Sequence, residues 1–98
     1  MIRHLVFFRL KDGADLPSVT TTLETLAQIP GVRAFEVGHN TRRDDAVSDE
    51  VDLVVHAVFD DVAALDAYKA HPIYQRSVQQ VRPLRDLRLA VDYETRLP

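Results

Sequence analysis

The order of strand-type and helix-type segments constrains the fold of this chain more than any other feature. Four segments rich in β-branched and aromatic residues are predicted to be strands: 2–10, 32–39, 51–59 and 87–94. A helix is predicted over 16–29, where apolar residues recur at helical spacing after a capping aspartate and before Pro30. A second helical region follows the third strand, is broken at Pro72 and ends at Pro83.

The resulting order, β-α-β-β-α-β, predicts an α+β fold of the ferredoxin-like type. In that fold a four-stranded antiparallel sheet carries its helices on one face. The chain has 98 residues, the size of one domain, so residues 1–98 are expected to form a single unit. The most polar stretch, 40–50, is expected to be a solvated loop because it has few apolar residues to hold it in place.

Alternation along each strand divides its side chains between the two faces of the sheet. One set is expected to meet the helices: His4, Val6 and Phe8 in the first strand, Leu53, Val55, Ala57 and Phe59 in the third, and Leu87, Leu89, Val91 and Tyr93 in the fourth.

The opposite face of the sheet is also apolar, at Leu5, Phe7, Val54, His56 and Val58. Two helical layers cannot be built from the helices available, so this second face has no cover within the chain. Exposed apolar patches of this size usually mark interfaces. We therefore expect a homodimer in which two copies pack sheet to sheet and form a barrel-like core.

His4 is the polar member of the helix-facing set. A lone histidine in an apolar strand is most often a core residue with a satisfied hydrogen bond. Tyr68 and Tyr74, however, lie in the helical region expected over the same face, and an imidazole and a phenol can exchange a proton. His4, Tyr68 and Tyr74 are therefore candidate catalytic residues of a small-molecule site.

The walls of that site are expected to include Val6, Phe8, Leu53, Val55 and His71. His71 also has a structural alternative, because a histidine before a proline at a helix boundary commonly only bonds the backbone. His56 and His39 also have non-catalytic interpretations. His56 is expected at the dimer interface, and His39 is expected near solvent.

Composition excludes several function classes. The absence of cysteine excludes disulfides, thiolate zinc sites and iron–sulfur clusters, and a net charge of −3 disfavours nucleic-acid binding. No apolar run reaches transmembrane length and the first residues lack the layout of a signal peptide, so we expect no membrane association and a cytoplasmic location. Neither metal-ligand spacing nor a glycine-rich phosphate loop occurs, so no metal and no cofactor are expected.

Several segments resemble the stress-responsive dimeric α/β-barrel (Dabb) family, and together they cover almost the whole chain. They are 2–8, 29–32, 37–40, 59, 68–72 and 89–93. The opening strand with its histidine and the Tyr-x-x-His-Pro segment are the most specific of them. The resemblance implies a ferredoxin-like monomer that dimerises through its sheet.

The resemblance leaves three functions open. One member of the family is a polyketide cyclase that uses histidine and tyrosine acid–base groups without a cofactor, in a pocket between sheet and helices. By that resemblance His4 and Tyr68 match catalytic residues, whereas a second catalytic histidine is replaced by Tyr74, a weaker base at neutral pH.

The first function is therefore binding of a small apolar or polyketide-like molecule, with or without such chemistry. The second is a non-catalytic, stress-associated homo-oligomer. The third is a monooxygenase of the related dimeric ferredoxin-like group, in which His39 or His71 would have to reach a haem iron.

Overall fold

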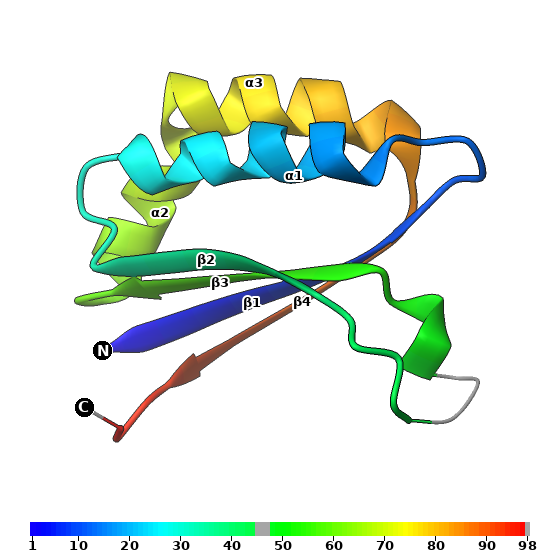
Figure 1. Ribbon diagram of the computed structural model, residues 1–98. Helices are drawn as coiled ribbons and strands as arrows, with labels where there is room; N and C mark the ends of the chain where they lie inside the picture. Colours follow the sequence, from blue (N-terminus) through cyan, green and yellow to red (C-terminus); the bar gives the residue numbers. More distant parts are fainter. Residues whose placement is uncertain (45–47, 98) are drawn as a thin grey trace.

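A computed structural model describes residues 1–44 and 48–97 (Figure 1). Its elements are β1 (Ile2–Leu10), α1 (Leu16–Glu24), η1 (Thr25–Gln28), β2 (Ala34–His39), η2 (Ser48–Glu50), β3 (Leu53–Phe59), α2 (Val62–Ala70), α3 (Pro72–Val81), η3 (Arg82–Leu84) and β4 (Arg85–Glu94), where η denotes a 3-10 helix. Part of the loop predicted over 40–50 falls on residues 45–47, which lie outside the described residues.

The four strands form one antiparallel sheet in the order β2-β3-β1-β4. All the α-helices lie on the same side of it, and α3 packs against both α1 and α2 (Figure 1). The ferredoxin-like α+β fold predicted from the order of segments is therefore confirmed. The helix predicted over 16–29 is α-helical only to Glu24 and continues as the 3-10 helix η1.

Side-chain caps fix where the helices begin. The Asp15 carboxylate accepts a hydrogen bond from the Ser18 amide at 3.1 Å, and the Asp61 carboxylate accepts one from the Ala64 amide at 2.8 Å. His71 ends α2 and starts α3, because its Nδ1 accepts from the amide of Ile73 at 3.1 Å. The proline after it occupies the first helical position, where no amide hydrogen is needed.

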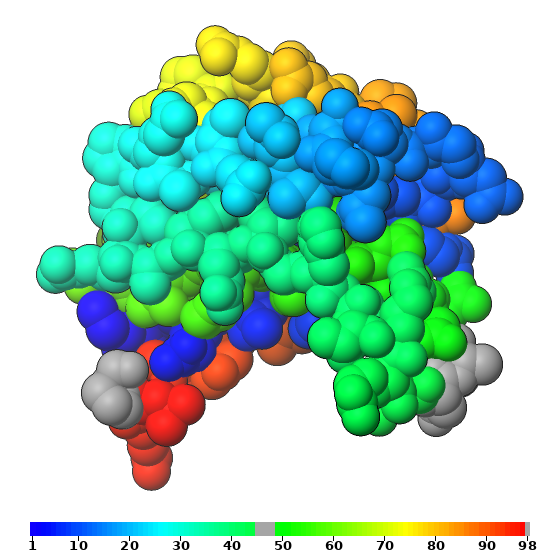
Figure 2. Space-filling model, in the orientation of Figure 1, coloured from blue at the N-terminus to red at the C-terminus, as the bar shows by residue number. Residues whose placement is uncertain are grey.

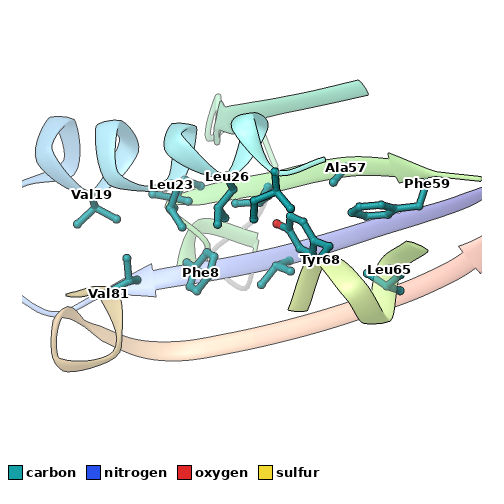
Figure 3. Close-up of a cluster of buried hydrophobic side chains, with 13 residues drawn as sticks. Phe8, Val19, Leu23, Leu26, Ala57, Phe59, Leu65, Tyr68 and Val81 are labelled. Carbon is teal, nitrogen blue, oxygen red and sulfur yellow. The ribbon is translucent and has the colours of Figure 1, made fainter. Parts of the chain in front are cut away.

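The core lies between the sheet and the helices (Figure 3). It is built from buried side chains of β1, β3 and the helices: Val6, Phe8, Val19, Leu23, Leu26, Ile29, Leu53, Val55, Ala57, Phe59, Leu65, Tyr68 and Val81. Within the part of the chain that the structure describes, no helix is long and apolar enough to span a membrane.

The prediction for β4 was wrong about which side the helices cover. Val91 pairs directly with Leu5 in the ladder and Leu89 with Phe7, so these residues share the face away from the helices. Leu89, Val91 and Tyr93 are 54%, 51% and 45% exposed. Alternation separates the two sets of side chains on a strand, but it does not say which set the helices cover.

The face of the sheet away from the helices is therefore apolar across β1, β3 and β4. Of the predicted interface residues, Leu5, Phe7, Val54 and His56 are half-buried, whereas Val58 is already only 7% exposed in the single chain. His56 accepts a hydrogen bond from Arg3 at 2.9 Å on this face. Figure 2 shows the underside hollowed between the C-terminal end of the chain and the segment that follows β2.

Candidate functional site

A cavity of about 300 Å³ lies between the helices and the inner face of the sheet. The strands contribute His4, Val6, Phe8, Val55, Arg85 and Arg88, and the helices contribute Leu23, Leu26, Tyr68, Tyr74, Gln75, Ser77, Val78, Val81 and Arg82. Its walls thus combine apolar side chains with polar and charged ones, so both an apolar body and polar groups of a small ligand could be contacted.

His4 is hydrogen-bonded to a carboxylate at the edge of this cavity. It lies directly opposite Asp92 in the β1–β4 ladder, and its Nδ1 contacts Oδ1 of Asp92. His4 is only 1% exposed, whereas the Asp92 side chain is 38% exposed and has Lys69 Nζ 4.0 Å from its second oxygen. The carboxylate is therefore solvated on one side and orients a buried imidazole on the other.

Burial lowers the pKa of His4, and this effect outweighs the opposing influence of the hydrogen bond and charge of Asp92. The imidazole is consequently neutral at pH 7. Because the carboxylate is the acceptor, the single ring proton is on Nδ1, and Nε2 keeps its lone pair. This is the protonation state that a general base requires.

Tyr68 is the second polar group in the wall. Its ring lies edge-on to His4, with 6.0 Å between ring centres, and 5.1 Å from the ring of Tyr74. Burial raises the pKa of Tyr68 well above its ordinary value of 10.0, so the phenol stays protonated and acts as a hydrogen-bond donor.

The Tyr68 hydroxyl faces the cavity. It forms no hydrogen bond to any residue that the structure describes. Every fully buried side-chain nitrogen or oxygen atom of the described residues has a hydrogen-bond partner, so the Tyr68 hydroxyl is not fully enclosed by protein. In Figure 3 this hydroxyl points away from Phe59, into the space between the helices and the sheet. A ligand in the cavity would therefore meet a free phenolic proton.

The structure brings most of the predicted site residues together but not all. His4, Val6, Phe8, Val55, Tyr68 and Tyr74 line the cavity. Leu53 instead lines a second hollow beside the end of β2, and His71 caps α3. His39 is hydrogen-bonded to Thr20 at 2.9 Å, so neither histidine required by the haem alternative lines the cavity.

The charged residues of the site were missed from the sequence: Asp92, Arg82, Arg85 and Arg88. Arg88 and Asp92 belong to the polar set of β4, which the prediction for this strand turned away from the helices. Alternation alone could not have found them, because a strand with one apolar and one polar set can turn either set towards the helices when it lies at the edge of a sheet. Among the described residues, no group of three or more possible metal ligands occurs.

The fold and the cavity define the class of this protein as a ferredoxin-like α+β protein with a ligand-sized cavity between its sheet and its helices. The family model described as the stress responsive A/B barrel domain matches residues 2–95. The chain therefore belongs to the stress responsive A/B barrel family, as the resemblance of its segments predicted.

Relatives agree with this assignment. The uncharacterized protein SCO4036 of Streptomyces coelicolor is 35% identical over 103 residues, covering 96% of this chain and 99% of its own. The structure of a dimeric ferredoxin-like protein of unknown function from Thermobifida fusca is similar with a TM-score of 0.83 and 26% identity, over 96% of this chain and 90% of that one.

A hydroxynitrile lyase from Passiflora edulis is also similar in structure, with a TM-score of 0.80 over 99% of this chain and 96% of its own. Its identity is 18%, so the likeness shows a shared fold alone.

Proposed function

We propose that the chain binds a small, largely apolar carbonyl compound in this cavity and that His4 abstracts a proton from the carbon beside the carbonyl. The observation that carries the proposal is the buried His4, which lines the cavity and is held by the carboxylate of Asp92. A neutral imidazole that is held by a carboxylate is oriented and made more basic by it.

The proposed step uses side chains alone. The C–H bond breaks, its proton moves to Nε2 of His4, and its electron pair forms the enolate, with the negative charge on the carbonyl oxygen. The Tyr68 phenol donates a hydrogen bond to that oxygen, where the charge develops. Asp92 stabilises the imidazolium that forms, because its carboxylate already accepts the Nδ1 proton.

Tyr74 completes the proposed site as a second phenol rather than a base. Its ring is stacked edge-on against Tyr68, and its hydroxyl lies 3.5 Å from the guanidinium of Arg88. In this role it positions the ligand and Tyr68, so the chemistry depends on one base, His4.

The proposal includes a homodimer formed through the sheet face away from the helices. Three side chains of β4 on this face, Leu89, Val91 and Tyr93, are about half exposed in the single chain. The structural relative from Thermobifida fusca is named as dimeric. A second copy seated on this face would bury these residues and join the two sheets into one core.

Hydrogen–deuterium exchange tests the chemistry directly. With 2-octanone as the probe in D₂O at pH 7, the protein is expected to speed the loss of the proton NMR signals beside the carbonyl. Replacing the base by His4→Gln should slow this exchange by about 10²-fold or more, the usual contribution of a general base. Tyr68→Phe should slow it by a similar or smaller factor, because one hydrogen bond to the enolate is lost.

His39→Gln is the matched control, because it replaces an exposed histidine that does not line the cavity. It should leave the exchange rate unchanged. An exchange rate no faster than that of free imidazole at the same concentration, or a rate equal in the wild type and His4→Gln, would overturn the proposed reaction.

A further inference from the structure

Three arginines gather at one part of the cavity wall: Arg82, Arg85 and Arg88. Arg85 and Arg88 are half-buried and Arg82 is exposed. Within residues 1–44 and 48–97, none of the three forms an ion pair with an acidic side chain. The proposed reaction uses none of them.

Three arginines elsewhere in the chain form ion pairs. Arg9 contacts Glu50 and Asp86, Arg33 contacts Asp60, and Arg42 contacts Asp52. The chain has fifteen acidic residues against twelve basic ones, so acidic partners are not scarce. Asp86 stands between two of the cavity arginines in the sequence, yet it pairs with Arg9, on a different strand.

The unpaired cluster is electrostatically unfavourable as it stands. Burial, together with the positive charges of Arg88 and Arg82, lowers the pKa of Arg85. An anion held among these guanidinium groups would remove the repulsion, and the planar fork of an arginine matches the oxygens of a carboxylate or a phosphate.

The cluster lies at a defined distance from the candidate base. Arg88 pairs with Phe8 in the β1–β4 ladder and Asp92 pairs with His4, so both β4 side chains face the helices. They are four residues apart, which is about 13 Å along a strand. Positive charge therefore lies on the same wall of the cavity as the base, and the charge of Arg88 is close enough to lower the pKa of His4.

We infer that the ligand of this site is an amphipathic anion, with an apolar body in the cavity and a carboxylate or phosphate group held by Arg85 and Arg88. This inference rests on the proposed function, because it assigns the ligand class of the same cavity. It places the anionic group several bonds away from the carbon that His4 deprotonates.

Three probes with the same eight-carbon chain test the inference by isothermal titration calorimetry at pH 7: octanoate, octan-1-ol and octyl phosphate. The affinity for octanoate is expected to exceed that for octan-1-ol by at least about tenfold, because a charged hydrogen bond replaces a neutral one. Raising the salt concentration should weaken the binding of octanoate and leave the binding of octan-1-ol unchanged. The ratio of octyl phosphate to octanoate affinity identifies which anion the site prefers.

Variants locate the effect. Arg88→Met and Arg85→Met should each weaken octanoate by about tenfold while octan-1-ol binds as before, which also shows that the cavity is intact. Arg76→Met is the matched control: it removes an exposed arginine of α3 that does not line the cavity, and it should keep the full preference for octanoate.

The two proposals fail in different ways. Equal affinities for octanoate and octan-1-ol in the wild type would overturn the anionic ligand and leave the apolar site standing. A preference for octanoate that survives both Arg85→Met and Arg88→Met would overturn the role of these arginines. If none of the three probes binds, the site proposed above fails, and the anionic ligand fails with it.

Discussion

His4 owes its chemistry to two opposing influences. Its 1% exposure disfavours the charged form, and the Asp92 carboxylate favours it. Burial is the larger of the two, so the pKa of His4 is below its ordinary value of 6.5. A histidine on the surface, with a pKa near 6.5, would be partly protonated at pH 7, whereas burial keeps His4 neutral there.

The lowered pKa makes folding stability depend on pH. In the unfolded chain His4 takes up a proton as the pH falls through about 6.5. In the folded chain it does so only at a lower pH. Stability contributed by the neutral imidazole is therefore present above that pH and is lost on acidification. We expect the free energy of unfolding, measured by urea denaturation at fixed protein concentration, to fall between pH 7 and pH 5.

NMR titration assigns the effect to one residue. The ring protons of His4 should titrate below pH 6.5, and Arg88→Met should move that pKa upwards, because the positive charge of Arg88 lowers it. Asp92→Asn should move it downwards, because the carboxylate raises it. A His4 pKa above 6.5 in the wild type would contradict this account.

At the scale of elements, the joint between α2 and α3 positions both tyrosines. Tyr68 lies in the last turn of α2 and Tyr74 in the first turn of α3, with the His71 cap between them. The start of α2 depends on the hydrogen bond from the Ala64 amide to the Asp61 carboxylate. The geometry of the aromatic pair therefore depends on caps several residues away.

Removing the cap of α2 should weaken the fold. Asp61→Ala is expected to lower the free energy of unfolding by about 1 kcal/mol, because an amide at the start of the helix loses its side-chain partner. Asp66→Ala, at an exposed position within the same helix, is the control and should change stability by less than about 0.5 kcal/mol. Equal losses in both variants, measured by urea denaturation, would show that the cap is not the cause.

At the scale of the whole molecule, the chain is apolar on both faces of its sheet but has helices on only one. The helix-free face includes half-exposed residues of β4 beside Leu5 and Phe7 of β1. The hollowed underside in Figure 2 is where the proposed second copy would sit. Such a surface on a chain of 98 residues favours a partner, because a small domain buries a modest share of its own surface.

A charge on that face should separate the two copies. Val91→Asp is expected to convert a dimer into a monomer in size-exclusion chromatography with light scattering, because the carboxylate would lose its hydration in the interface. Ala90→Asp places the same charge on the preceding residue, which faces the helix side of the sheet, and should leave the dimer intact. A wild-type protein that is monomeric at all concentrations, or a dimer that survives Val91→Asp, would contradict the predicted interface.

The sequence alone was sufficient for the order of elements and most of the core. Period-two and helical spacing are local properties, since they follow from how the backbone of a strand or a helix places successive side chains. The expected layer of helices over one face of the sheet put Tyr68 and Tyr74 on the same side as His4, and all three line one cavity in the structure. The sequence also placed the break between α2 and α3 at Pro72.

Only the tertiary structure decided how β4 is turned and what lies beside His4. The partner of His4 is 88 positions away, and they meet because the β1–β4 register sets one opposite the other. Alternation along β4 has two solutions related by a flip of the strand, and choosing between them requires knowing where the helices pack. The arginine cluster in the cavity wall and the His4–Asp92 pair depend on that choice. Long-range pairing, unlike periodicity, is not a property of any one segment.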